Sequence, residues 1–183
     1  MSRDPHAKSH ARVRRHLAVI DEIVAPIVDR YREHIQCRSG CSECCHQSFR
    51  VTALEGAVLR AGLEALAPEL RAQIIERARR YEPDTRTPCP ALSEQGKCTL
   101  YEHRPRICRK YGIPLWHPDD PHTLKTCRLN FQTLRAPGDD FIEHVIEPQT
   151  RWFSDWIETR EALGLAGKPA EKRSIAAWLA DAE

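Results

Sequence analysis

The chain has 183 residues, of which 41% are hydrophobic and 30% are charged. This length fits one domain, or a modest domain with helical appendages, and it can bury a hydrophobic core. No apolar run approaches the roughly 18 residues that a membrane span needs, and the N-terminus lacks the apolar core of a signal peptide. We therefore expect a cytoplasmic protein without a membrane partner. The formal charge of +2 does not indicate a nucleic-acid binder.

The first part of the chain carries a basic segment and then a helical pattern. Residues 1–16 hold five Arg or Lys side chains against a single acid, and no aromatic residue is present for stacking on bases. We interpret this segment as a solvated terminus that leads into a helix. Apolar residues then recur in steps of three and four from Val13 to Ile35, which predicts one helical face. Pro26 removes a hydrogen bond to the preceding turn, so we expect a kink or a split near residues 23–25.

Two helices are predicted in the middle of the chain. Thr52 and Glu55 have the spacing of a capping box, so a helix should begin there and run to about Leu66. A second should begin at Pro68 and end at Pro83. These two helices should bring the cysteines on either side of them together and supply an apolar wall.

The last part of the chain is also predicted to be helical. The pattern indicates a short helix over residues 141–147, a longer one from Pro148 to Gly164 and a last amphipathic one after Pro169. The fold class we predict is mainly α, with helices flanking an irregular, loop-rich cysteine core that binds metal. We divide the chain into an N-terminal helical segment (1–36), a cysteine-cluster metal-binding domain (37–130) and C-terminal helices packed on the same domain (131–183).

All the cysteines lie between residues 37 and 127, and four of them crowd into residues 37–45. Two thiolates separated by two or three residues in a turn can reach one tetrahedral ion at about 2.3 Å from each sulfur, and Gly40 tolerates the positive φ that such a turn needs. Cysteines as small core residues are one alternative, but these have polar and charged neighbours. Disulfides are another, but they belong to oxidising compartments. The predicted metal ligands are Cys37, Cys41, Cys44, Cys45, Cys89, Cys98, Cys108 and Cys127.

Prolines and basic residues surround these thiols in the sequence. The prolines between residues 88 and 121 predict loops and single helical turns, which can steer distant ligands to one ion. Eight bound thiolates with two divalent ions would change the formal charge from +2 to −2. We expect some neighbouring cations to balance thiolate charge by hydrogen bonds to the ligands. The candidates are Arg38, Arg50, Arg104, Arg106, Arg109, Lys110 and Arg128.

With these residues in view, the chain resembles the bacterial cysteine-cluster proteins of the CxxCxxCC, or YkgJ-like, family, which are described as zinc- or iron-chelating domains. The resemblance covers about residues 37–127, half of the chain. It is carried by the first cluster ending in Cys44-Cys45, by Cys89-Pro90-Ala91-Leu92, by Cys98 followed by Tyr101, by Arg104-Pro105 leading to Cys108-Arg109, and by Cys127. Cys37 and Cys41 are separated by three residues, where the family's name implies two. The resemblance implies chelation by these cysteines and assigns no reaction and no single metal.

Eight thiols can make two four-thiolate sites, or one cluster with four ligands and additional thiols. Cys44 and Cys45 are consecutive, so their side chains diverge by about 100° in a helical turn. We expect them to serve different ions, or one of them to bind while the other caps, bridges or reacts. Four thiolates around zinc would be structural, whereas an iron–sulfur cluster could be chemically active. The cofactor is therefore expected to be an iron–sulfur cluster or zinc.

Two enzyme alternatives stay open at this point. The spacing of Cys37, Cys41 and Cys44 is similar to that of radical S-adenosylmethionine enzymes, although this chain lacks repeated strand signals and is short for their barrel. The cysteine motif is also similar to that of flagellin lysine-N-methylases, but no glycine-rich methyl-donor loop is present. No nucleophile with a recognisable base and orienting group stands out, so catalytic residues and a protein partner are left unassigned.

Histidine ligation is a third possibility for the metal site. Four histidines lie near the cysteines in the sequence, namely His46, His103, His117 and His122. Because the thiolates already suffice, we expect each imidazole to be exposed or hydrogen-bonded rather than ligating. His46, adjacent to Cys45, is the exception to test.

Overall fold

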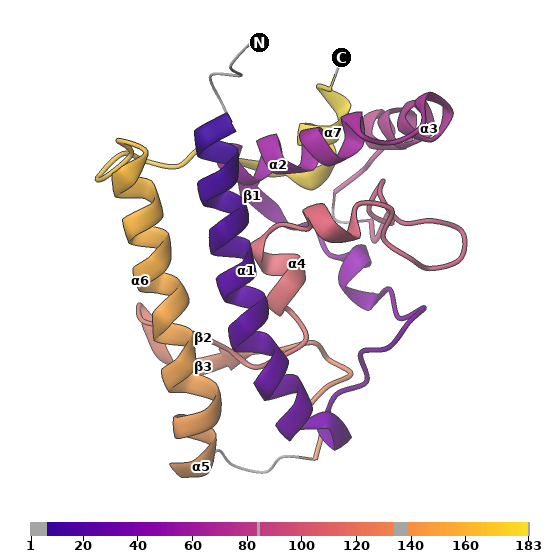
Figure 1. The fold of residues 1–183 in the computed structure, drawn as a ribbon. Coiled ribbons are helices and arrows are strands. Elements are labelled where there is room, and N and C mark those ends of the chain that lie inside the picture. Colours follow the sequence, from indigo (N-terminus) through magenta and orange to yellow (C-terminus); the bar gives the residue numbers. More distant parts are fainter. Residues whose placement is uncertain (1–6, 84, 134–138, 183) are drawn as a thin grey trace.

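The computed structural model describes residues 7–83, 85–133 and 139–182. The fold is mainly α, as predicted. Helix α1 (Ala7–Arg30) runs through the middle of the molecule, and α6 (Glu147–Ala162) lies alongside it (Figure 1). Helices α2 (Ala53–Glu64), α3 (Pro68–Arg79) and α7 (Ile175–Ala180) gather at one end. Within the described residues, no helix is long and apolar enough to cross a bilayer.

Helix α1 differs from the prediction at Pro26, and it includes most of the basic N-terminal segment. It continues through Pro26 to Arg30, so the predicted split is wrong, and the kink stays a prediction. The apolar stripe explains why, since Ile20, Ile23 and Ile27 are all buried against the same neighbours on both sides of the proline. Packing thus outweighs the loss of one backbone hydrogen bond. Residues 7–16 belong to this helix, whereas residues 1–6 lie outside the described part of the chain.

The capping box between Thr52 and Glu55 is confirmed. The Thr52 hydroxyl accepts a hydrogen bond from the Glu55 backbone N–H, and the Glu55 carboxylate accepts one from the Thr52 backbone N–H at 3.0 Å. Helix α3 begins at Pro68, as expected. A short helix α4 (Arg106–Lys110) sits between α1 and the cysteine-containing loops.

The C-terminal helices start and join differently from the prediction. Helix α5 (Asp139–Phe141) continues into a π-helical turn (Ile142–Ile146) and then directly into α6, so the expected short helix is part of one helical run. Pro148 occupies the first turn of α6, where a missing N–H costs nothing. The last helix begins only at Ile175, because residues 172–174 form a strand.

Short strands form two small antiparallel sheets that the sequence did not predict. Strand β1 (Arg50–Thr52) pairs with β4 (Lys172–Ser174), and β2 (Leu115–His117) pairs with β3 (Asp120–Lys125). In the first sheet Val51 lies opposite Arg173. This pairing fastens the C-terminal segment to the residues that follow the first cysteine group.

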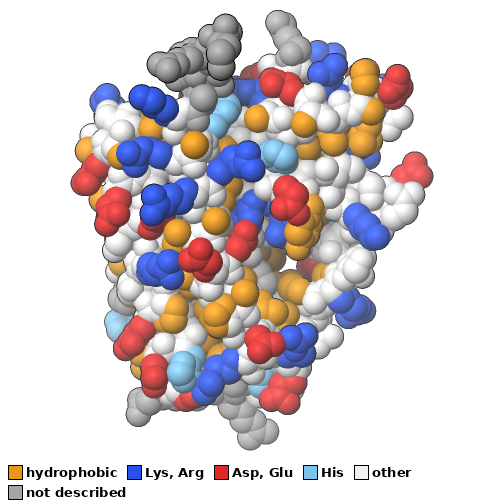
Figure 2. All heavy atoms as spheres, in the orientation of Figure 1, with side chains coloured by type: hydrophobic (Ala, Val, Ile, Leu, Met, Phe, Trp, Pro, Cys, Tyr) orange, Lys and Arg blue, Asp and Glu red, His pale blue; other side chains and the backbone are white. Residues whose placement is uncertain are grey.

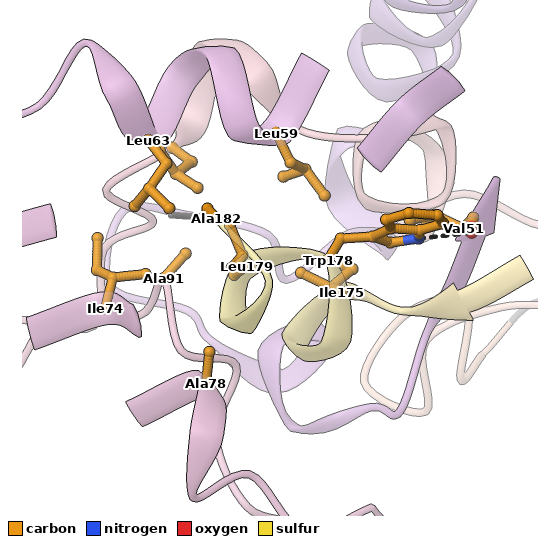
Figure 3. Packing of buried hydrophobic residues seen from close by; sticks show 11 residues of the cluster. Val51, Leu59, Leu63, Ile74, Ala78, Ala91, Ile175, Trp178, Leu179 and Ala182 are labelled. Carbon is orange, nitrogen blue, oxygen red and sulfur yellow. Dashed lines mark hydrogen bonds between the residues drawn. The ribbon is translucent and has the colours of Figure 1, made fainter. Parts of the chain in front are cut away.

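A hydrophobic core forms where α2, α3 and α7 meet. Leu59 and Leu63 from α2 face Ile74 from α3 and Leu179 from α7 (Figure 3). The Trp178 indole N–H donates a hydrogen bond to the Val51 carbonyl oxygen at 3.1 Å, which joins α7 to β1. A second core lies between α1 and α6. Figure 2 shows that the face beside α1 is hollowed, with hydrophobic side chains along the hollow.

Candidate metal centre

The cysteines meet at one cavity of about 1400 Å³, which we call the cysteine cavity. Its walls come from α1, from the first cysteine segment, from the loop before α4 and from α4 itself. All eight cysteines line it, and none forms a disulfide. Among the described residues, no three His, Cys, Asp or Glu side chains converge closely enough to hold a metal ion. The thiols thus line the cavity without converging on one point.

The first cysteine segment lies along this cavity as a turn followed by a single 3-10 turn. Gly40 has φ = +86°, as the sequence suggested for a chain that reverses here. Cys44 and Cys45 both lie in the 3-10 turn Glu43–His46. A hydrogen bond from the Cys45 thiol lowers the pKa of Cys44, and the same contact, together with burial, raises the pKa of Cys45. Cys44 is thus the thiol of this pair that more readily becomes a thiolate.

Cys89, Cys98 and Cys108 line a deeper wall of the cavity. All three pack against the hydrophobic core of α2, α3 and α7. Burial raises the pKa of Cys89 to about 12 and the pKa of Cys108 well above its ordinary value. Without metal these thiols are therefore protonated at neutral pH, and ligation must release their protons.

Backbone amides already point at several of the thiols. Burial raises the pKa values of Cys89, Cys98 and Cys127, while a backbone hydrogen bond lowers each of them in part. The donors are the N–H groups of Ala91, Leu100 and Leu129, each two residues beyond its cysteine. Hydrogen bonds of this kind favour the charged thiolate.

Asn130 is a buried residue of the site that the sequence reasoning missed. Its side-chain N–H donates to the Cys37 sulfur at 3.4 Å and to the Gly112 carbonyl oxygen at 2.6 Å, and its amide oxygen accepts from the Gln36 backbone N–H at 2.8 Å. Asn130 thereby joins three loops around Cys37. Only its nearness in sequence to Cys127 could have pointed to it.

Most of the predicted cations are engaged with other groups rather than with sulfur. Arg106 pairs with the buried Glu55, and the Lys110 ammonium lies 4.3 Å from the Trp152 ring centre. Arg109 donates to the Arg104 carbonyl oxygen at 2.8 Å and forms an ion pair with Asp21 on α1. These contacts hold α4, and with it Cys108, against α1, α2 and α6.

The other four predicted cations also have partners other than sulfur. Arg104 stacks on the exposed Tyr101 ring, 3.5 Å from its centre, and its charge contributes to lowering the pKa of Cys44. Arg128 pairs with Glu43. Arg38 donates to the backbone of Gln36, and Arg50 to the backbone of Lys172. Arg104 is therefore the predicted cation whose charge reaches the cysteine cavity most directly.

None of the four candidate histidines is among the residues that line the cysteine cavity in the described structure. The His46 ring is hydrogen-bonded to the Ser42 carbonyl oxygen at 3.0 Å, and His103 packs against Gly62 of α2. His117 lies beside Asp119 and the Phe153 ring, and His122 is exposed on β3. The cysteines therefore remain the candidate ligands of this cavity.

A search against known families matches residues 36–128 to a family model named CxxCxxCC and described as a "putative zinc- or iron-chelating domain". The match spans half of the chain and includes all eight cysteines. The chain belongs to the CxxCxxCC family. No curated protein and no solved structure was found to match it. The CxxCxxCC match ends two residues before Asn130.

Proposed function

We propose that this CxxCxxCC protein binds iron, as an iron–sulfur cluster, or zinc through its cysteine thiolates. The observation that supports the proposal most directly is that all eight free cysteines line one cavity, although they are spread over residues 37–127. Thiolate sulfur is the donor that both zinc and iron–sulfur centres prefer. We also propose a cytoplasmic location, where such thiols stay reduced.

The groups around the thiols would also stabilise the negative charge of a thiolate centre. The backbone N–H groups of Ala91, Leu100 and Leu129 already favour thiolate at three cysteines. Asn130 supplies a further donor at Cys37, and Arg104 supplies a positive charge near Cys44. A bound zinc ion would cross-link the loops, whereas an iron–sulfur cluster would add electron transfer.

The enzyme alternatives receive no support from the described fold. Radical S-adenosylmethionine enzymes are built on a barrel of alternating strands and helices, whereas the strands here form two separate two-stranded sheets. The similarity to flagellin lysine-N-methylases extends only to the cysteine motif. We therefore favour a metal-binding module and propose no reaction.

The deciding experiment is the metal and acid-labile sulfide content of protein purified anaerobically, together with its visible absorption spectrum. Iron with matching sulfide and visible colour identifies a cluster, whereas colourless protein with zinc and no sulfide identifies a zinc site. Cys44→Ser and Cys45→Ser should each lower the metal content and the melting temperature, and Ser39→Ala in the same segment should change neither. Unchanged metal content and melting in both cysteine variants would refute their role as ligands.

A further inference from the structure

The cysteine cavity is wide enough for its thiols to fall into two groups. We propose that they form two metal centres, an outer one from Cys37, Cys41, Cys44 and Cys127 and an inner one from Cys45, Cys89, Cys98 and Cys108. This inference rests on the proposed metal binding and adds the number of centres and the ligands of each.

Three of the inner cysteines pack against one hydrophobic core. Cys89, Cys98 and Cys108 pack against the same hydrophobic core, so their positions are set by α2, α3 and α7. The Cys89 backbone N–H donates to the Cys45 carbonyl oxygen at 2.7 Å, which brings Cys45 to the same wall. Motion of this group is limited by the core behind it.

The outer group is held by polar contacts instead. Glu43, between Cys41 and Cys44 in the sequence, pairs with Arg128, which follows Cys127. The two Arg128 nitrogens lie 2.7 and 3.1 Å from the two Glu43 oxygens, so the contact is bidentate. It links the first cysteine segment to the last cysteine.

Asn130 connects Cys37 to the loop that carries Cys127. It follows Cys127 by three residues and donates to the Cys37 sulfur at 3.4 Å. The Cys127 carbonyl oxygen accepts from the Asn130 backbone N–H at 2.9 Å, so the loop that carries both residues is a defined turn. Cys37 and Cys127, at opposite ends of the cysteine domain, are thereby brought to one rim of the cavity.

The Cys44-Cys45 pair lies at the division between the two centres. The residues are consecutive in a 3-10 turn, where side chains one residue apart diverge by about 120°. One sulfur can therefore face the outer group while the next faces the inner group. We assign Cys44 to the outer centre because it directly follows Glu43, which is held to Arg128 next to Cys127. We assign Cys45 to the inner centre because its carbonyl oxygen accepts from the Cys89 backbone N–H.

Pairs of substitutions within and across the groups test this division. The full-length chain would be stripped of metal under reducing conditions, and Co²⁺ alone would be titrated while thiolate-to-cobalt absorption is recorded. The wild type should bind two equivalents, and Cys127→Ser or Cys98→Ser one each. Cys41→Ser with Cys127→Ser, both in the outer group, should still bind one. Cys127→Ser with Cys98→Ser, across the groups, should bind none.

The alternative is a single joint cluster, in which any one of these substitutions would reduce binding as much as the cross-group pair. That result would overturn the two-centre proposal while leaving metal binding intact. A wild type that binds no Co²⁺ and contains no iron or zinc as purified would instead refute the proposed function.

Cadmium NMR of the wild type needs no variant and so avoids the question of whether a variant folds. Protein loaded with ¹¹³Cd²⁺ should give two resonances without cadmium–cadmium coupling. A single resonance, or two resonances coupled through a shared thiolate, would overturn the proposal of two separate centres.

Discussion

The side-chain nitrogen of Asn130 lies 3.4 Å from the Cys37 sulfur, and the rest of the amide is arranged so that this nitrogen must face the thiol. The amide oxygen accepts from the Gln36 N–H at 2.8 Å, and rotation of the amide would set two donors against each other there. Asn130 is 2% exposed, so water cannot take the place of the Cys37 sulfur or of the Gln36 N–H as its partner. Cys37 is thereby provided with a fixed hydrogen-bond donor.

Replacing Asn130 with Asp tests that donor specifically. Asn130→Asp keeps an oxygen acceptor for Gln36 but removes both N–H donors and places a negative charge beside the Cys37 sulfur. We expect metal affinity to fall by about 10- to 100-fold, the usual effect of losing a partner that orients a ligand. Competition with a chelator would measure the change.

The matched control for this variant is Gln132→Glu, which makes the same chemical change at an exposed residue nearby. Gln132 donates to the Arg128 carbonyl oxygen and not to sulfur. If both variants lose the same amount of metal affinity, the added charge causes the loss, and the Asn130 N–H is not needed as a donor to Cys37.

Gly112 gives a second prediction about the position of Cys37. A Cβ atom on Gly112 would lie 2.8 Å from the Cys37 sulfur, which is too close for any real contact. Gly112→Ala should therefore displace the sulfur, weaken metal binding and lower the free energy of unfolding by about 1–3 kcal/mol, as overpacking usually does.

A double-mutant cycle would identify the cause of that loss. In a Cys37→Ala background, where the sulfur is absent, Gly112→Ala should cost little stability. Urea unfolding of the four proteins measures the coupling. If Gly112→Ala lowers the free energy of unfolding equally in both backgrounds, the added methyl group does not clash with the Cys37 sulfur.

How far the sequence predicts this fold depends on whether the signal is local. The Thr52–Glu55 capping box and the start of α3 at Pro68 involve neighbours in the chain, and both are confirmed. The split at Pro26 was wrong because burial on both sides of the proline decides the helix. Strand β1 has three residues and a partner 122 residues away, so neither pattern nor length reveals it.

The candidate site, too, could be predicted only where its signal is local in the sequence. The cysteines stand out by type and spacing, so the candidate ligands can be read from the sequence. The residues that orient them cannot, because Asn130 and Gly112 are ordinary residue types whose role depends on three loops meeting at Cys37. Some of the neighbouring arginines were expected to balance thiolate charge, but Arg106 and Arg109 pair with carboxylates on helices that are distant in the sequence.

Glu55 is predicted to be essential for the position of α4. This carboxylate is 2% exposed and accepts from the Arg106 backbone N–H at 3.0 Å as well as from Thr52. Glu55→Gln leaves the Arg106 guanidinium without its anion, so we expect a loss of about 3 kcal/mol in the free energy of unfolding. Glu64→Gln, at an exposed position of the same helix, is the control and should lie within about 0.5 kcal/mol of the wild type. A loss of under 1 kcal/mol in Glu55→Gln would contradict this role.

His16 should make stability depend on pH. His16 is 1% exposed, its Nδ1 lies 2.5 Å from Asp155, and the tilted Trp156 ring lies 4.8 Å away between ring centres. Burial lowers the pKa of His16, the contact with Asp155 partly opposes this, and the charge of Arg106 lowers it further. Below about pH 6.5 the unfolded chain therefore binds a proton at His16 that the folded chain resists. The free energy of unfolding should fall as the pH decreases through this range, by at most about 1.4 kcal/mol per pH unit.

The measurement is urea unfolding of wild type and His16→Gln at pH 7.5 and at pH 5.5. The two proteins differ only at His16 and in the surroundings of Asp155, which contacts it, so the difference between their pH dependences reports on the His16–Asp155 pair. The wild type should lose more stability than His16→Gln on acidification, whereas His117→Gln, at an exposed ring, should follow the wild type. If His16→Gln loses as much as the wild type, His16 is protonated equally easily in the folded and unfolded chains. In that case its burial and the charge of Arg106 do not favour the neutral ring.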